Sequence, residues 1–324
     1  MPKNELAHLP YSSGSCSFCR AMMVDNLDSV PSDARIAFLG IPFDEGTVYR
    51  PGSRFGPRSI REASIVYGSS AKGFGGFYDI EVGRVLLTRT RMVDVGDVKI
   101  IPTRSDLTYE KITATVSDLL DRGLLVVSAG GDHSVSFPVI RAHAGRGRIN
   151  LVQFDTHLDF TDEVSGARYT QGSPMRRASE LERIDTITQI GVRGLLNSPV
   201  SHMSALAAGN TIVTTKDLRE IGAEQTIRMI PPGDCYVTID IDLLDPSIAP
   251  GTGTPEPGGL GYDEMKELLA ALARRQDITI RGFDLVEVNP LFDQNGITAL
   301  LASRLILDFL GMIWADEEDP LCLA

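Results

Sequence analysis

The sequence Ile149-Asn-Leu-Val-Gln-Phe-Asp-Thr-His-Leu-Asp159 decides the fold, because an apolar run leads directly into three polar side chains that can bind metal. Two other apolar runs repeat this order: Leu124–Ala129 before His133 in Gly-Gly-Asp-His-Ser, and Cys235–Ile239 before Asp240-Ile-Asp242. Partly β-branched runs of this length are typical of buried strands in a parallel sheet. The pattern predicts that the polar clusters lie at carboxyl ends of strands, where open α/β sheets bind ligands.

The spacing within these clusters predicts a metal centre. Side chains two apart on an extended chain point the same way, so each cluster can face one cavity. Four carboxylates and two imidazoles form an oxygen-rich ligand set that suits Mn²⁺ better than it suits a structural Zn²⁺, which prefers Cys and His. Ni²⁺ and Co²⁺ are alternatives. Two such ions balance the carboxylates and lower the pKa of bound water to roughly 7, as a hydrolase needs. The expected ligands are His133, Asp155, His157, Asp159, Asp240 and Asp242.

Each motif alone has a simpler explanation. An isolated Asp-x-Asp after a strand is usually a turn or a helix cap, and Gly-Gly-Asp-His can be an ordinary loop. The chain has five histidines, of which His133 and His157 occupy these strand ends while 8, 143 and 202 do not. Because all three clusters share the same strand context, we interpret them jointly as a two-metal site.

The rest of the chain alternates strand and helix patterns. That alternation predicts a three-layer α/β/α sandwich with a mainly parallel sheet, formed by one domain over residues 34–324 behind an N-terminal arm, 1–33. Strands are expected to begin near Ile36, Met92, Leu124, Ile149, Thr186, Thr211, Cys235 and Thr279, and helices to cover 57–66, 107–121, 138–143, 262–275 and 297–310. The glycine-rich segment 251–259 matches no phosphate loop and is expected near the mouth of the cavity.

Composition restricts the functional classes. The 324 residues are 43% hydrophobic with a net charge of −12, which argues against nucleic acid or an anionic membrane as a partner. No signal-peptide pattern begins the chain, and no run of ~18 apolar residues predicts a membrane span. Four cysteines indicate no disulfide scaffold, so we expect a cytoplasmic protein in which Cys16 and Cys19 are ordinary thiols of the arm.

From about Arg35 to Gly311, the chain resembles the ureohydrolase family, especially its agmatinase-like branch. The resemblance rests on the three clusters together with Val286-Glu-Val-Asn-Pro290 and the stretch Arg50–Ser64. It implies a sheet of about eight strands. It also implies that His133, Asp155, Asp159 and Asp240 hold one metal, and that His157, Asp155, Asp240 and Asp242 hold the other.

The resemblance further implies hydrolysis of a guanidino group to urea and an amine. Glu287 would receive the substrate guanidinium, since a carboxylate accepts two of its N–H groups in parallel, and Asp159 would orient the bridging hydroxide. The alternative for Glu287 is an ion pair with Arg281 or Arg304. Family members commonly form trimers or hexamers, so we expect a homo-oligomer whose last apolar stretch, Leu305–Leu310, serves as core or as interface.

One position departs from the family pattern. Gln171, in Thr-Gln-Gly-Ser-Pro, stands where these enzymes usually carry a histidine that is associated with proton delivery or substrate contact. An amide does not titrate near neutral pH, and loss of a general acid typically costs about 10²- to 10⁴-fold in rate. Gln171 therefore indicates either a substrate other than agmatine, which it would help to bind, or slow catalysis. By sequence neighbourhood alone, His202 is a candidate substitute.

Two functional classes follow from these observations. The first is an active binuclear amidinohydrolase acting on agmatine or on a related or alkylated guanidine. The second is a weakly active or non-catalytic subunit that assembles with an active paralogue, and Gln171 motivates it. Six intact ligands favour the first class. A zinc deacylase on the related fold is disfavoured because His133 and Asp242 supply ligands for a second metal.

Overall fold

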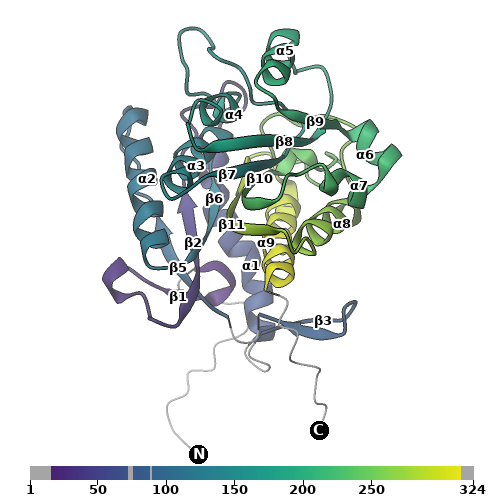
Figure 1. The fold of residues 1–324 in the computed structure, drawn as a ribbon. Coiled ribbons are helices and arrows are strands. Elements are labelled where there is room, and N and C mark those ends of the chain that lie inside the picture. The colour runs from purple at the N-terminus through teal and green to yellow at the C-terminus, as the bar shows by residue number, and fades with distance from the viewer. Residues whose placement is uncertain (1–15, 72–75, 88–89, 315–324) are drawn as a thin grey trace, which may run out of the picture.

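The computed structural model, which describes residues 16–71, 76–87 and 90–314, has a nine-stranded sheet as its middle layer (Figure 1). Its order is β1-β5-β2-β6-β11-β10-β7-β8-β9, and all neighbouring strands are parallel. The strands are β1 (Met22–Met23), β2 (Ala34–Ile41), β5 (Arg91–Asp97), β6 (Leu125–Gly130), β7 (Ile149–Phe154), β8 (Ile184–Val192), β9 (Thr211–Thr214), β10 (Gly233–Asp240) and β11 (Ile278–Val286). All eight predicted strands are present, and the ninth, β1, is too short for a sequence pattern to reveal.

Helices cover both faces of the sheet, which confirms the predicted three-layer architecture. Helices α2 (Ser105–Asp121) and α3 (Ser136–Ala144) pack together on one face, and α1 (Gly56–Ala71), α8 (Tyr262–Ala273) and α9 (Ile297–Ile313) pack on the other (Figure 1). A separate hydrophobic cluster fills each interface. The sequence analysis did not predict four short helices: α4 (Pro174–Ala178), α5 (Pro199–Ala207), α6 (Thr215–Ile221) and α7 (Ala223–Arg228). Of these, α4, α6 and α7 are too short to show a clear helical period.

Helix α9 is long and apolar enough to cross a membrane by length and composition alone. The helical stretch Gln294–Ile313 contains an 18-residue window with a mean hydropathy of 1.7, so the expectation that the chain has no such stretch was wrong by length and composition. However, 61% of this window is buried inside the domain, where α9 packs against α1 and α8. Leu305, Ile306 and Leu310 are fully buried. The stretch is therefore a core helix within this chain, which is one of the two roles expected for Leu305–Leu310.

The described part of the N-terminal arm packs onto the domain. Phe18 is fully buried and stacks on Phe38 of β2, with ring centroids 4.3 Å apart. The backbone N–H of Cys19 donates to the Ser64 hydroxyl at 2.7 Å. Burial raises the pKa of the Cys19 thiol, and both Cys16 and Cys19 are free. A small antiparallel hairpin, β3 (Phe77–Asp79) with β4 (Arg84–Leu86), lies apart from the main sheet.

Strand order explains how distant motifs meet. The strands β6, β11, β10 and β7 are consecutive neighbours in the middle of the sheet. Their pairing aligns Leu285 with Ala129, Asp240 with Val286, and Ile239 with Phe154. Because these strands are parallel, their carboxyl ends reach the same edge. The last residue of β10, Asp240, and the segments that follow the four strands carry all of the predicted metal ligands and Glu287.

Candidate functional site

The structure brings the six predicted metal ligands together at the carboxyl edge of the sheet. Two groups have ligand atoms close enough for one ion each: His133 with Asp155 and Asp159, and Asp155 with His157 and Asp242. Asp155 belongs to both groups. The remaining ligand, Asp240, places a carboxylate oxygen 3.2 Å from Nδ1 of His133. Five of the six predicted ligands therefore fall in these two groups, and Asp240 lies beside the first of them.

The imidazole of His133 has an unusual surrounding that fits a cation. Its Nδ1 lies 3.0 Å from Asp155, 2.8 Å from Asp159 and 3.2 Å from Asp240, yet it has no hydrogen-bond partner. Burial lowers the pKa of His133, but the negative charge of Asp159 and the closeness of the other two carboxylates raise it well above its usual value. A buried nitrogen surrounded by three carboxylates is satisfied when a metal ion stands between them.

A buried hydrogen-bond chain fixes how His133 is oriented. Its Nε2 lies 2.9 Å from the Thr238 hydroxyl, which donates to a carboxylate oxygen of Asp284 at 2.6 Å. The Tyr236 hydroxyl donates to the other oxygen of Asp284 at 2.7 Å. Since the Thr238 proton is used on Asp284, the hydroxyl accepts from Nε2–H of His133. Nδ1 is therefore the nitrogen with a lone pair for the metal.

A second chain of amides holds the shared ligand, Asp155. The Gln153 side chain donates to a carboxylate oxygen of Asp155 at 2.7 Å, and the other oxygen accepts from the backbone N–H of His157 at 2.6 Å. Gln189 donates to Gln153 at 2.5 Å, and Asn210 donates to Gln189 at 2.9 Å. All four polar side chains are at least nine-tenths buried, so this chain fixes Asp155 from the side away from the cavity.

Sequence reasoning missed both chains. Their members sit inside apolar strands: Gln153 in β7, Thr238 in β10 and Asp284 in β11. A polar residue within a buried strand is a usable signal, because burial without a hydrogen-bond partner is costly. The partners depend on which strands are neighbours, and the sequence does not state that order.

Two of the other three ligand carboxylates, Asp159 and Asp242, have different supports. Asp159 has a left-handed backbone (φ 47), and its carbonyl accepts from Met175 at 3.1 Å and Arg176 at 3.2 Å. Asp242 is buried with one carboxylate oxygen unpartnered, while the other accepts from Thr254 at 3.2 Å and lies 3.2 Å from Nδ1 of His157. The orphaned oxygen of Asp242 is a second buried atom that a cation would satisfy.

Glu287 follows β11 and faces the same cavity. Its backbone is left-handed (φ 64), and its carboxylate accepts from the backbone N–H of His133 at 2.8 Å. Burial, with the charge of Asp132 next, raises the pKa of Glu287 well above its usual value. The alternative ion pairs do not form, because Arg281 pairs with Asp234 and Arg304 pairs with Asp79 and Asp308.

Close backbone contact explains the glycines before His133. The backbone N–H of Glu287 donates to the carbonyl of Gly131 at 2.9 Å. A Cβ on Gly131 would lie 1.9 Å from the Phe43 carbonyl oxygen, so no side chain fits where these loops meet. The Gly-Gly-Asp-His motif therefore lets the two backbones approach closely, which places His133 beside Glu287.

The site opens into a cavity of about 570 Å³. Metal-ligand side chains and Glu287 line its base, and Gln171, 8% exposed, lies in its wall. Thr254 and Pro255 of the glycine-rich segment also line it, as predicted for that segment. His202 on α5 is exposed and is not among the described residues that line the cavity, so the structure gives it no place as a substitute for the missing histidine.

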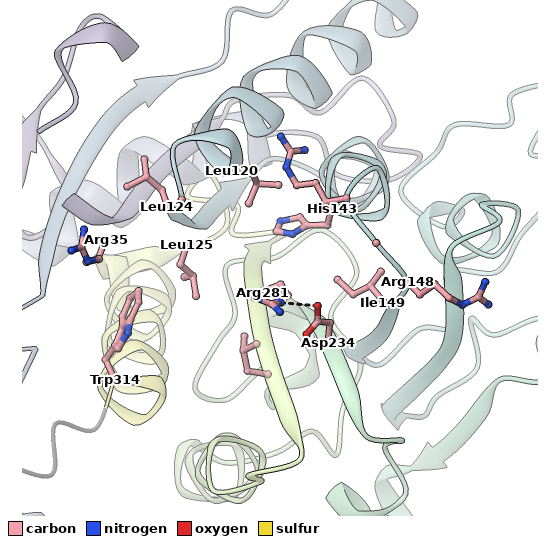
Figure 2. Close-up of a pocket in the computed structure, with 14 residues that line it drawn as sticks. Arg35, Leu120, Leu124, Leu125, His143, Arg148, Ile149, Asp234, Arg281 and Trp314 are labelled. Carbon is pink, nitrogen blue, oxygen red and sulfur yellow. Dashed lines mark ion pairs between the residues drawn. The ribbon is translucent and has the colours of Figure 1, made fainter. Parts of the chain in front are cut away.

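A second cavity, of about 410 Å³, lies at the amino ends of the strands, opposite the metal-ligand side chains (Figure 2). Its arginines already have structural partners. Arg281 pairs with Asp234 at 2.8 Å, and Arg146 donates to backbone carbonyls near the ends of α2 and α3. Such contacts satisfy the carbonyls left free at helix carboxyl ends. The metal-ligand groups found in the described residues belong to the other edge.

Comparison with known proteins agrees with this geometry. Guanidinopropionase from Pseudomonas aeruginosa is 32% identical over 317 residues, which are 95% of each chain. An agmatinase from Neisseria meningitidis is 36% identical over 294 residues, covering 89% of this chain and 90% of the relative. The structure of proclavaminate amidinohydrolase from Streptomyces clavuligerus matches with a TM-score of 0.82 at 32% identity, covering 94% of this chain and 99% of that one. Since the Arginase family model also matches residues 34–311, which include every ligand described above, the chain belongs to the arginase family.

Proposed function

We propose that this protein is a binuclear-metal amidinohydrolase that hydrolyses the guanidino group of a small guanidine compound to urea and an amine. The observation that carries the proposal is the pair of ligand groups that share Asp155, each with a buried atom that lacks a partner. His133 Nδ1 and Asp242 Oδ1 are those atoms. The relatives named guanidinopropionase, agmatinase and proclavaminate amidinohydrolase support the same chemistry for this chain.

The six ligands suit two divalent ions, with manganese as our first choice and nickel or cobalt as alternatives. His133, Asp155, Asp159 and Asp240 would hold one ion, and His157, Asp155, Asp240 and Asp242 the other. When bound, such ions make a water molecule acidic enough to ionise near neutral pH. The chains through Thr238 and Gln153 keep His133 and Asp155 in place for this purpose.

Glu287 would receive the guanidinium of the substrate. Its carboxylate is buried, lines the cavity and has no arginine or lysine partner among the described residues. A guanidinium can donate two parallel N–H bonds to such a group, which restores the charge balance that burial disfavours. Asp159, whose carboxylate lies 2.8 Å from Nδ1 of His133, would orient the attacking water toward the guanidinium carbon.

The reaction then needs one proton transfer. Water oxygen adds to the planar carbon, and the C–N bond breaks once a proton reaches the leaving nitrogen, which gives urea and an amine. Gln171 cannot supply that proton, because an amide does not titrate near neutral pH. Asp159 is the proposed carrier, since the same carboxylate that orients water is placed to accept its proton and pass it on.

A urea-release screen of the metal-loaded protein tests the proposal. The panel contains agmatine, arginine, 4-guanidinobutyrate, 3-guanidinopropionate, guanidine and alkylguanidines, each with Mn²⁺, Ni²⁺ or Co²⁺. We expect urea from at least one linear guanidine, and about two ions per chain by elemental analysis. Absence of urea from every compound, with two ions bound, would reject the amidinohydrolase proposal.

The second candidate is a weakly active or non-catalytic subunit that assembles with an active paralogue. Gln171 at the cavity wall is the observation that favours it. Such a subunit would bind few ions or none, and would gain activity only when mixed with its partner. We also keep the expectation of a homo-oligomer, a trimer or a hexamer, which light scattering at micromolar concentration tests directly.

A further inference from the structure

The cavity at the amino ends of the strands is basic, although the chain as a whole carries a net charge of −12. Among the described residues that line it, the charged side chains are one carboxylate, Asp234, and four guanidinium groups, those of Arg35, Arg146, Arg148 and Arg281 (Figure 2). The cavity therefore attracts negative charge that most of the protein repels.

Three of these arginines already have a carboxylate beside them. The pairs are Arg281 with Asp234, Arg146 with Asp121, and Arg148 with Asp185. The positive charge of each of these three side chains is therefore balanced within the described part of the chain.

Arg35 differs from the other three arginines. It is exposed at the start of β2, and its Nη1 donates to two backbone carbonyls, those of Ala34 at 3.0 Å and Ser32 at 3.4 Å. It forms no ion pair with any described residue, since the neighbouring Asp33 pairs with Arg91 at 2.8 Å instead. A carbonyl carries no net charge, so the charge of Arg35 stays unbalanced while other N–H groups of its guanidinium remain able to donate.

An acidic stretch of sequence begins at this cavity. The described part of the chain ends at Trp314, which follows α9 and lines the cavity at the same end as Arg35 (Figure 2). The sequence continues as Ala315-Asp-Glu-Glu-Asp319, outside the described residues. At up to ~3.5 Å per residue, the four acidic residues can reach between about 7 and 18 Å from Trp314. Their carboxylates are thus tethered close to the unbalanced guanidinium.

The tether favours this segment over a free anion as the occupant of the cavity. A group on a short linker has an effective concentration in the millimolar range at a nearby site, whereas a free anion must approach a protein of net negative charge. The apolar residues agree with this choice. Leu120, Leu124 and Leu125 line the cavity, and Leu321 and Leu323 follow the acidic residues in the sequence. The cavity and the segment therefore match in both charge and apolar character.

We propose that the acidic segment 316–319 docks in the cavity at the amino ends of the strands of its own chain, with a carboxylate paired to Arg35. The docked segment connects the end of α9 to β2. It balances the one guanidinium of the cavity that has no carboxylate partner among the described residues. This contact is separate from the proposed hydrolysis, which takes place at the carboxyl ends of the strands.

Fluorescence of Trp314 tests the proposal, because Trp314 is the only tryptophan of the chain and lines the cavity. The comparison is between the metal-loaded parent and a variant with Asp316→Asn, Glu317→Gln, Glu318→Gln and Asp319→Asn. At low salt, acrylamide should quench the variant roughly twofold more strongly, since a docked segment shields the indole. At about 1 M NaCl, where charges are screened beyond about 3 Å, the parent should become equal to the variant. Equal quenching of the two proteins at low salt would overturn the inference.

A change of Arg35 tests the other partner. Arg35→Gln should increase quenching about as much as neutralising the segment does, and combining the two changes should add little, because either one alone breaks the same pair. Arg122→Gln is the matched control, because Arg122 is exposed nearby at the end of α2, pairs with Asp28 and does not line the cavity. The control should keep the parent value. An Arg35→Gln variant that also keeps it would overturn the inference.

A pair of introduced cysteines distinguishes the chain's own segment from that of a second copy. Leu125 lines the cavity, and its backbone pairs with Ile36, next to Arg35. In a Cys322→Ser background, Leu125→Cys with Glu317→Cys should form a disulfide within one chain on mild oxidation. Adding Arg35→Gln should slow its formation several-fold. A dimer band on a denaturing gel without reductant, or a rate that Arg35→Gln leaves unchanged, would overturn the inference.

Discussion

The side-chain oxygen of Gln171 accepts a hydrogen bond from the backbone N–H of Val48 at 3.2 Å, which joins the two loops that form the cavity wall. The backbone N–H of Gln171 strengthens this link by donating to Gly46 at 2.9 Å. The residue that departs from the family pattern thus has a defined structural contact. It holds the segment that leads to Arg50, whatever else it contributes to binding.

Replacing Gln171 with leucine should weaken substrate binding without loss of metal. The variant loses one hydrogen bond of about 0.5 to 1.5 kcal/mol net, so kcat/KM should fall roughly 2- to 12-fold through KM. Steady-state kinetics on the best substrate of the screen, together with metal analysis, measures this. An unchanged KM would show that the link between the loops has no role in binding.

Gln171→His distinguishes altered specificity from lost proton transfer. If Gln171 serves recognition, as we expect, the histidine variant should not be faster on the preferred compound. Had the chain lost a general acid here, the histidine would bring back a titratable group and raise turnover, by up to about 10²-fold. A markedly faster variant on agmatine, in a parent that already prefers agmatine, would establish the second explanation.

Asp155 should be the ligand on which both metal ions depend. It belongs to both ligand groups and is fixed by Gln153 at 2.7 Å. Asp155→Asn should therefore remove both ions and the activity, whereas His133→Ala should mainly weaken one site. Metal content after dialysis, measured per chain, checks the difference. Two retained ions and normal turnover in Asp155→Asn would show that the ligand assignment is wrong.

The chain from His133 through Thr238 to Asp284 should influence metal affinity from outside the ligand set. Thr238→Val removes the hydroxyl that accepts from Nε2 of His133 and leaves the volume nearly unchanged. Loss of such an outer contact typically lowers metal affinity about 10- to 100-fold. Titration with Mn²⁺ followed by calorimetry measures it, and Thr238→Ser, which keeps the hydroxyl, should bind nearly as well as the parent. Equal affinity in the valine variant would contradict the proposed orientation of His133.

Glu287 should contribute to substrate binding and not to metal binding. Glu287→Gln keeps the shape but removes the charge, and loss of a buried charged partner costs about 2 to 5 kcal/mol. We expect kcat/KM to fall by the corresponding factor while about two ions stay bound. If the ions leave together with the activity, Glu287 is a ligand or a structural residue instead.

The strand ends, and the meeting of the six candidate ligand side chains there, were predictable because local signals determine them. Apolar runs identify β6, β7 and β10, and their shared parallel direction brings the segments after them to one edge. The partners behind the ligands were not predictable. Whether Thr238 meets Asp284 or Gln153 meets Gln189 depends on the order of strands in the sheet, which requires long-range pairing.

Other differences from the prediction have equally physical causes. The strand Met22–Met23 has only two residues, so it forms because β5 offers an open edge and not because of its own pattern. The five-residue helix α4 begins at Pro174, a favoured first position, but shows less than two turns of periodicity. The contact between Gln171 and Val48 joins residues 123 apart in sequence, and no local rule connects them.

His143 predicts a dependence of stability on pH that is separate from the metal centre. It lies on α3, against the ring of Tyr236 at 4.7 Å, in the cavity at the opposite edge of the sheet (Figure 2). Its side-chain Nε2 is buried without a partner. Burial, followed by the charges of Arg146 and Arg281, lowers the pKa of His143 to about 3, so the folded protein keeps this imidazole neutral.

Because the pKa of His143 is lower in the folded than in the unfolded state, the unfolded chain binds the extra proton first. The stabilisation from the neutral imidazole is complete above about pH 6.5 and is lost as the pH falls from there toward about 3. The loss approaches roughly 1.4 kcal/mol per pH unit within this window. His143→Gln, which cannot titrate, should remove that contribution, so the parent and the variant should converge in unfolding free energy as the pH falls. Urea unfolding of both proteins between pH 7 and pH 4.5 measures the difference, and two parallel curves would show that His143 is not buried as a neutral side chain.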